Sequence, residues 1–432
     1  MSSDPFAPIF VPDAVSEAVS GRAWVRAMLD VEAALASAQA RAGVLPAEAA
    51  EAIVAACDGD DFDVEALARE GRASGNPVVP LVRALTERLA SEASGYVHWG
   101  ATSQDVLDTA AMLVARRARE LILADLDAVA AACASLADTH RSTLMPGRTL
   151  MQHALPTSFG LKAAGWLVAV VEARGRLAAL ELFVELGGAA GTLASLGDRG
   201  LAVLRALAQE LGLAEPPLPW HTNRIGVAHL GATLALAAGA LEKVALDVVL
   251  MTQAEVGELA EPAGDGRGGS STMPQKRNPV GSIRARACAR RVRAATGVLL
   301  EAMAAEHERA AGAWQAEWGA LGEALAFTGG AAAAVRETLE GLEVHPDRMR
   351  VNLERGGDSL LAESAAMTLA ERLGRVEAKR VVEEAVRRGG SLRDGLSGQL
   401  TDEELDRALD PERYLGSAEA FIDRALEAYR SG

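Results

Sequence analysis

Long stretches without helix-breaking residues constrain the fold of this chain more than any other feature. From Asp105 to Met145 there is neither glycine nor proline, and apolar residues recur at alternating steps of four and three, at Leu107, Ala111, Val114, Ala118 and Leu121. Proline is also absent between Pro219 and Pro262 and between Pro279 and Pro346, where alanine is abundant. Each of the three stretches predicts a long helix with an apolar seam that a single helix cannot bury alone.

Composition favours helices over strands. The chain has 432 residues with only 7 Phe, 6 Trp and 3 Tyr, so its core must consist mainly of Ala, Leu and Val. Strands prefer aromatic and β-branched residues, and no convincing series of strands is present. We therefore predict an all-α fold, with a long-helix bundle over residues 105–345, a smaller helical N-terminal domain over 1–104 and a small helical C-terminal domain over 346–432.

Shorter helices are expected beside the long ones. Segments 161–190 and 198–211 have helical patterns. Near the C-terminus, Thr401 and Glu404 form a Thr-x-x-Glu capping box, which predicts that a helix begins there.

Charge and cysteine usage exclude several classes of protein. The formal net charge of −16 argues against binding to nucleic acid or to an anionic membrane. Three widely spaced cysteines favour a reducing compartment, and no cluster with metal-ligand spacing is present, so neither a metal nor a cofactor is expected. The N-terminus lacks the pattern of a secretory signal, and the most apolar stretch, 225–241, is shorter than a membrane span. A cytoplasmic protein is the expectation.

One glycine-rich loop, residues 261–279, interrupts the helical pattern most strongly. Its four glycines are followed by a polar cluster within nine residues, consisting of Ser270, Ser271, Lys276, Arg277 and Asn278. A loop of this kind is either a flexible connector or a segment whose backbone approaches a ligand. Neither standard phosphate-binding spacing is present, so the polar cluster favours a different small-molecule site.

The end of this loop, GSSTMPQKRNP, resembles the signature loop of the fumarase/aspartase superfamily. Two further segments are similar to the substrate-binding regions of that superfamily in order and spacing: HWGATSQDVLDT at 98–109 and GRTLMQHALPTSFG at 147–160. The resemblance covers nearly the whole chain. It implies an all-α homotetramer with a shared helix bundle, in which each active site takes these three regions from three subunits.

The resemblance also implies the site residues. Ser270 would be the residue that removes or delivers a proton, and Lys276 and Asn278 would hold the carboxylate whose charge grows during the reaction. The substrate-binding set would comprise His98, Thr102, Ser103, Arg148, Thr149, Gln152, His153, Ser271, Met273, Arg277 and Asn278. Two alternatives stay open: Ser271 as a turn hydroxyl bonded to its own loop, and His98 as a hydrogen-bonding partner of a neighbouring helix end.

Two departures from the superfamily pattern narrow the reaction. Fumarases and adenylosuccinate lyases have a histidine, paired with a glutamate, where this chain has Leu150 and Ile283. Expelling an amine or hydroxide needs a general acid, whereas a carboxylate, with a pKa near ~4, leaves unprotonated. The pair of aliphatic residues therefore favours the 3-carboxy-cis,cis-muconate cycloisomerases of this superfamily. In these enzymes a carboxylate of a tricarboxylate substrate adds to a C=C bond of the same molecule, a step in protocatechuate breakdown.

Two other functions remain as alternatives. A C–N or C–O lyase of the same superfamily, such as an adenylosuccinate lyase-like enzyme releasing fumarate, would share the loop but not Leu150 and Ile283. A catalytically silent structural homologue would not need Ser270, Lys276 and Asn278.

Overall fold

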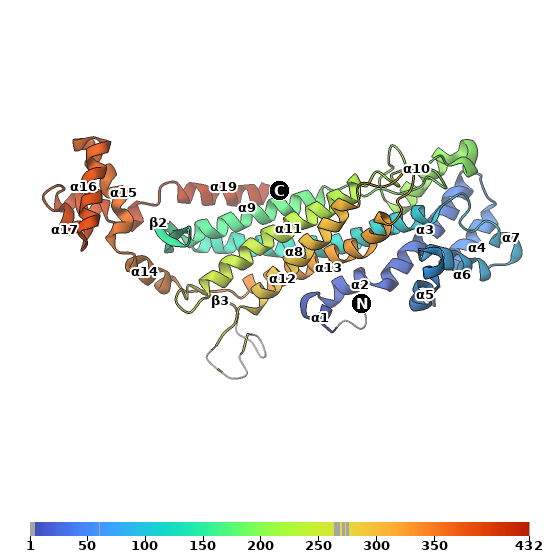
Figure 1. The fold of residues 1–432 in the computed structure, drawn as a ribbon, viewed down its shortest axis with the longest axis horizontal. Helices are drawn as coiled ribbons and strands as arrows, with labels where there is room; N and C mark the ends of the chain where they lie inside the picture. Colours follow the sequence, from blue (N-terminus) through green and yellow to red (C-terminus); the bar gives the residue numbers. More distant parts are fainter. Residues whose placement is uncertain (1–4, 60, 263–267, 270–272, 274–275, 432) are drawn as a thin grey trace. The chain divides into compact units, whose positions relative to one another are not determined.

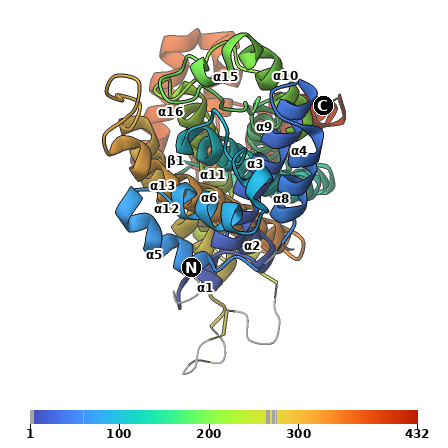
Figure 2. The ribbon, with the colours of Figure 1, turned by 90° about the vertical axis from the view of Figure 1, so that its right-hand side faces the viewer.

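The computed structural model describes residues 5–431 except 60, 263–267, 270–272 and 274–275. Ser270 and Ser271 of the expected site therefore lie outside the described residues. The described chain is built mainly of helices, with two small antiparallel strand pairs, and the predicted all-α, long-helix class is confirmed (Figures 1 and 2).

Contacts divide the chain into two compact units made of interleaved segments. Unit 1 comprises 1–125, 173–241 and 284–333, and unit 2 comprises 126–172, 242–283 and 334–432. The long helices have residues in both units: α8 (Ser103–Thr139), α9 (Phe159–Ala178), α11 (Ile225–Met251), α12 (Val280–Glu301) and α13 (Ala313–Leu339). The division into three domains at 104 and 345 stays a prediction.

The other elements of unit 1 are helices, most of them short. They are α1 (Ala7–Phe10), α2 (Asp13–Ala18), α3 (Gly21–Arg41), α4 (Ala47–Cys57), α5 (Val64–Ser74), α6 (Val78–Glu87), α7 (Ser91–Ser94), the 3-10 helix η1 (Ala194–Arg199) and α10 (Gly200–Leu211).

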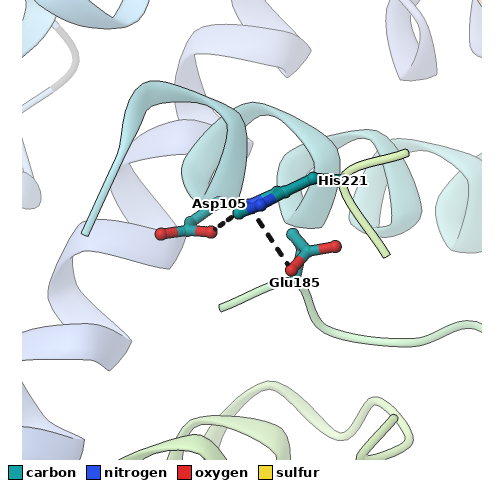
Figure 3. A group of neighbouring side chains, drawn as sticks. All are labelled: Asp105, Glu185 and His221. Atoms are coloured by element: carbon teal, nitrogen blue, oxygen red, sulfur yellow. Dashed lines mark hydrogen bonds and ion pairs between the residues drawn. The ribbon is translucent and has the colours of Figure 1, made fainter. Parts of the chain in front are cut away.

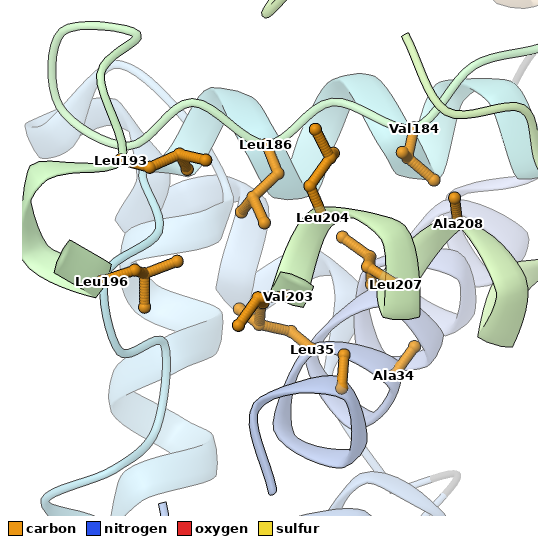
Figure 4. Packing of buried hydrophobic residues seen from close by; sticks show 11 residues of the cluster. Ala34, Leu35, Val184, Leu186, Leu193, Leu196, Val203, Leu204, Leu207 and Ala208 are labelled. Carbon is orange, nitrogen blue, oxygen red and sulfur yellow. The ribbon is translucent and has the colours of Figure 1, made fainter. Parts of the chain in front are cut away.

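Packing of α3 against α10 supplies one core of this unit (Figure 4). Leu35 of α3 and Leu204 and Leu207 of α10 are almost fully buried, and Val184 and Leu186 complete the cluster from the segment that follows α9. Small residues such as Ala34 and Ala38 on α3 allow the two helices to approach closely. The cluster fixes the segment around 184–188 that the candidate site uses.

The predicted seam of α8 is buried as expected. Leu107, Ala111, Val114 and Ala118 are nearly inaccessible to solvent, and Leu121 is partly buried. The predicted extent of this helix was wrong at its end, because α8 ends at Thr139 and a strand begins at Leu144.

A second correction concerns the stretch between Pro279 and Pro346. It forms two helices, α12 and α13, rather than one, because residues 302–312 leave the helical conformation and Gly312 adopts a φ of 125°. Absence of proline was not enough to predict a continuous helix across a segment that ends in glycine.

Unit 2 contains a hairpin that the sequence pattern did not reveal. Strands β1 (Leu144–Thr149) and β2 (Gln152–Ser158) pair antiparallel, with an irregularity at Gly147. A two-residue ladder joins β3 (Leu259–Ala260) to β4 (Glu343–Val344). Pro146 and Pro156 interrupt the apolar alternation that would have marked the strands of the hairpin.

The remaining helices of unit 2 follow β4. They are α14 (Pro346–Arg355), η2 (Asp358–Leu361), α15 (Ala362–Leu373), α16 (Arg375–Arg388), α17 (Leu392–Leu396), α18 (Asp402–Ala408), η3 (Pro411–Arg413) and α19 (Ala418–Ser431). The predicted capping box is confirmed at the start of α18, where Thr401 accepts from the Glu404 N–H and Glu404 accepts from the Thr401 N–H. No helix among the described residues is both long and apolar enough to cross a membrane.

Close contact between α13 and α1 leads to a first prediction. A Cβ on Gly330 would lie 2.4 Å from the Phe10 carbonyl oxygen, whereas a Cβ on Gly319 of the same helix would meet no atom within 4 Å. We expect Gly330→Ala to destabilise the protein by about 1–3 kcal/mol through overpacking. Gly319→Ala should be neutral or stabilise it by up to ~1 kcal/mol through higher helix propensity. Thermal unfolding of both variants checks this, and equal effects would contradict the close approach.

Candidate active site

In unit 1, the predicted binding segment 98–103 leads directly into α8 and is held by buried side chains of α3. The His98 Nδ1 atom lies 2.6 Å from Glu32 Oε1, and Gln39 Nε2 donates to the Trp99 carbonyl oxygen over 2.6 Å. Glu32 and Gln39 are 2% and 1% exposed. His98 has a φ of 57°, a left-handed conformation that costs a residue with a Cβ about 1–3 kcal/mol and requires such support.

The environment of His98 favours its charged form. Burial lowers the pKa of the imidazole, but the Glu32 carboxylate, and further away Asp105, outweigh burial and raise the pKa above its ordinary value. The side chain keeps 18% of its surface exposed. His98 is therefore partly exposed and more readily charged than a free histidine, and its substrate role stays a prediction beside the structural one.

Asp105, near the start of α8, ties the segment to two other parts of unit 1. Its carboxylate accepts the Thr102 N–H over 2.8 Å, the Gly187 N–H over 2.9 Å and the Gly188 N–H over 3.0 Å. His221 Nε2 lies 2.7 Å from the same carboxylate. Four partners thus converge on one carboxylate that is 1% exposed.

Glu185 extends this network (Figure 3). Its Oε2 accepts the Trp220 N–H over 2.6 Å, while its buried Oε1 has no hydrogen-bond partner and lies 3.6 Å from His221 Nε2. Burial, together with the charges of Asp105 and Asp108, raises the pKa of Glu185 to about 9. Glu185 is consequently protonated at neutral pH.

Among the described residues, Asp105, Glu185 and His221 form a group that could hold a metal ion, since one ligand atom from each lies within 4.8 Å of the others. The 2.7 Å separation of His221 from Asp105 is an ordinary hydrogen-bond distance, and backbone N–H groups already occupy both carboxylates. Hydrogen bonding accounts for the arrangement. Local sequence patterns do not reveal Glu32, Gln39, Glu185 and His221, because the residues that they contact lie between 35 and 116 positions away along the chain.

The raised pKa of Glu185 makes stability depend on pH. The unfolded residue ionises near 4.5 and the folded one near about 9, so this group stabilises the fold fully at acidic pH and progressively less as pH rises between these values. We expect Glu185→Gln to become more stable relative to the wild-type protein with rising pH, by up to about 1.4 kcal/mol per pH unit. Thermal unfolding at several pH values checks this. Parallel pH dependences would show that Glu185 is ionised in the folded protein.

In unit 2, the hairpin carries the second predicted binding segment at its tip. Thr149 pairs with Gln152 and Arg148 with His153, which leaves Leu150 and Met151 as a two-residue loop. Their φ values are 50° and 67°, and their exposed fractions are 96% and 73%. Two-residue hairpin loops usually contain Asn-Gly, because these residues adopt positive φ values easily. Leu150 and Met151 therefore have a strained backbone, and their apolar side chains are exposed to water.

Arg148 is engaged within its own unit. Its two terminal nitrogens donate to both carboxylate oxygens of Glu258, over 2.9 and 2.6 Å, and Asn352 Nδ2 donates to Glu258 Oε1 over 2.8 Å. Glu258 is fully buried. Arg148 thus neutralises a buried carboxylate, and its substrate role stays a prediction that must be separated from this structural one.

We expect Arg148→Ala to destabilise the protein by about 3–5 kcal/mol, because it leaves the buried Glu258 carboxylate without a counter-charge. Gln152→Ala, at an exposed position of the same hairpin, should change stability by less than ~0.5 kcal/mol. Denaturant unfolding compares the two variants. A stable Arg148→Ala protein would contradict the structural role.

The signature loop of unit 2 is fixed at its described ends. The Asn278 backbone N–H and Nδ2 both donate to the Gly268 carbonyl oxygen, over 2.9 and 3.1 Å. Arg277 pairs with both carboxylate oxygens of Glu343 and donates to the Glu261 carbonyl oxygen. Met273, Lys276 and Arg277 are exposed and Asn278 is partly buried.

Glu261, the first residue of the loop, caps the N-terminus of α12, the helix that follows the loop. Its carboxylate accepts the N–H groups of Gly281 and Ser282 over 2.9 and 2.8 Å, and the Ser282 hydroxyl over 2.6 Å. Placing a carboxylate at the N-terminus of α12 satisfies free N–H groups and complements the helix dipole. The first residue of the loop is therefore bonded to the helix that follows the loop's last residue.

The predicted residues fall into two groups. His98, Thr102 and Ser103 belong to unit 1, while Arg148, Thr149, Gln152, His153, Met273, Lys276, Arg277 and Asn278 belong to unit 2.

Comparison with known proteins identifies the class. A family model described as Lyase matches residues 11–294. The chain is 50% identical to nitrosuccinate lyase of Streptomyces davaonensis, covering 97% of this chain and 93% of that protein. It is 45% identical to 3-carboxy-cis,cis-muconate cycloisomerase of Bradyrhizobium diazoefficiens, covering 98% and 97%.

A solved structure agrees with these relatives. The crystal structure of 3-carboxy-cis,cis-muconate lactonizing enzyme from Pseudomonas putida matches with a TM-score of 0.92 at 41% identity, covering 99% of both chains. The chain therefore belongs to the lyase family of the fumarase/aspartase superfamily, as the three sequence motifs indicated, and is an enzyme of that class.

Proposed function

We propose that this enzyme converts 3-carboxy-cis,cis-muconate to a carboxymuconolactone by adding one substrate carboxylate to a C=C bond of the same molecule. The observation that carries the proposal is the absence of an acid at two key positions. Leu150 occupies the exposed hairpin tip, and Ile283, 50% exposed, lies in the first turn of α12. Neither side chain can donate a proton to a leaving group.

The chemistry of the leaving group explains how the enzyme can work without an acid at Leu150 and Ile283. In the reverse direction a lactone opens by expelling a carboxylate, whose conjugate acid has a pKa near ~4, so it leaves without protonation. An amine or a hydroxide is far more basic and needs a general acid. The cycloisomerases named among the relatives at 45% identity are consistent with this reading.

The reaction then proceeds without a cofactor. A substrate carboxylate forms the new C–O bond, and the electron pair of the C=C bond moves toward the carbon beside another carboxylate. Ser270 delivers its hydroxyl proton to that carbon and regains one from water, so one proton is taken up for each lactone formed. Lys276, Asn278 and loop N–H groups stabilise the negative charge that develops on the carboxylate.

Substrate binding needs local positive charge in a chain with net charge −16. Lys276 and Arg277 are exposed, and His98, which is partly exposed, has surroundings that favour its charged form. Hydrogen-bonding groups complete the proposed set: Thr102, Ser103, Thr149, Gln152, His153, Ser271 and Asn278, with Met273 packing beside them. Arg148 would contribute charge from its pair with Glu258.

We further propose a homotetramer whose active sites combine segments from several subunits. Leu150 and Met151 support this, because two strained apolar residues that are 96% and 73% exposed call for cover by another surface. The enzyme would act in the cytoplasm, in the β-ketoadipate pathway of protocatechuate breakdown.

A second candidate is the elimination of nitrite from nitrosuccinate. The 50% identity to nitrosuccinate lyase supports it. Nitrite, like a carboxylate, is a weak base that needs no general acid to leave, so Leu150 and Ile283 fit this reaction as well. They fit adenylosuccinate-type elimination less well, because an amine leaves there.

The proposal predicts that purified protein, without added metal or nucleotide, removes the conjugated-diene absorbance of 3-carboxy-cis,cis-muconate. Ser270→Ala should lower kcat by at least about 10²-fold while leaving thermal stability and subunit number unchanged. Absorbance spectroscopy measures the rate, and mass spectrometry identifies the lactone. No change in absorbance with folded wild-type protein would refute the assignment.

A further inference from the structure

We propose that Glu32 is a positioning residue, which fixes His98 as a charged hydrogen-bond donor for a carboxylate of the substrate. The inference rests on the proposed function for the contact with substrate, but the pairing of Glu32 with His98 stands on the geometry of the free protein. Glu32 does not touch the substrate itself. It lies on α3, 66 residues before its partner.

The first step is the direction of the hydrogen bond. Glu32 Oε1 lies 2.6 Å from His98 Nδ1, and an ionised carboxylate can only accept, so Nδ1 must be the donor. The Glu32 side chain is 1% exposed. A carboxylate so deeply buried requires a counter-charge, and the His98 imidazolium is the cation paired with it among the described residues.

The second step concerns the other ring nitrogen. With Nδ1 bonded to Glu32, Nε2 of the imidazolium carries the remaining N–H. The His98 imidazole has no second hydrogen-bond partner in the part of the chain that the structure describes, and 18% of the side chain is exposed. The Nε2–H group is thus available to an anion arriving from solvent.

The third step is rigidity. His98 is held at a φ of 57° by a turn whose next residues are anchored separately, through Gln39 to the Trp99 carbonyl and through Asp105 to the Thr102 N–H. The ring therefore cannot follow a ligand by moving the backbone. A fixed orientation of the His98 ring suits the binding of a carboxylate at one position, even though the backbone is strained.

The charged groups that face His98 from the elements packed against it are Glu32 from α3 and Asp105 from α8. Both favour the imidazolium, whereas burial opposes it. As pH rises through the pKa of His98, the charge is lost and substrate binding should weaken. Replacing Glu32 by a neutral isostere should move this loss to lower pH.

The test is a titration of His98 by NMR in protein labelled with 13C at histidine Cε1, with His98→Gln assigning its signal among seven histidines. We expect a pKa above ~6.5 in the wild-type protein, and a decrease of at least about one unit in Glu32→Gln. Gln39→Leu is the matched control: it breaks the neighbouring anchor to Trp99 without changing charge and should leave the His98 titration in place. A wild-type His98 whose pKa is not above ~6.5 overturns the charged-donor role even if Glu32→Gln fails to fold.

A kinetic measurement tests the role toward substrate. With whichever substrate the enzyme turns over, Glu32→Gln should raise KM by up to about tenfold, the factor for one pKa unit, at pH values above the pKa of His98 in both proteins, with a smaller change in kcat. A lowered His98 pKa with unchanged KM across the pH range would overturn the positioning role. Because the titration uses the free protein, failure of the proposed reaction cannot be mistaken for failure of the pairing.

Discussion

The carboxylate of Asp105 is the interaction on which unit 1 depends most. It joins three parts of the chain: Thr102 just before α8, the pair Gly187 and Gly188, and His221 just before α11. Each partner comes from a different part of the sequence, and an unpaired donor at any of them would be buried without a hydrogen bond. Arg309 adds a further tie, since it donates to Gln104 beside Asp105 and to the Gly188 and Ala189 carbonyls.

This arrangement explains why a segment that the sequence marks as substrate-binding is rigid. Residues 98–102 form neither a helix nor a strand, and one of them is strained. Buried polar side chains supply the order instead: Glu32 and Gln39 from α3 and Asp105 from α8. Binding residues held in this way lose little conformational entropy when a ligand arrives.

Sequence patterns predicted the helical class, the buried seam of α8 and the capping box at Thr401, because these follow from local periodicity and capping chemistry. They failed at the β1–β2 hairpin, whose prolines hide the strand pattern, and at residues 302–312, where the helix is interrupted. The motif residues were found because they are contiguous in sequence. Glu32, Glu185 and His221 were not found, because their contacts are with residues far away in the sequence, and local sequence patterns do not predict such contacts. The engagement of Arg148 by Glu258 was hidden for the same reason.

The central claim is that replacing the general acid by Leu150 and Ile283 suits the enzyme to carboxylate addition. The most direct measurement compares kcat/KM for 3-carboxy-cis,cis-muconate and for nitrosuccinate on one preparation, with adenylosuccinate as the substrate whose leaving group is basic. We expect adenylosuccinate not to be turned over, because its leaving group is basic. The proposed function further requires a higher kcat/KM for the muconate than for nitrosuccinate. Preference for nitrosuccinate would assign the enzyme to the second candidate reaction, and turnover of adenylosuccinate would contradict the argument from the missing acid.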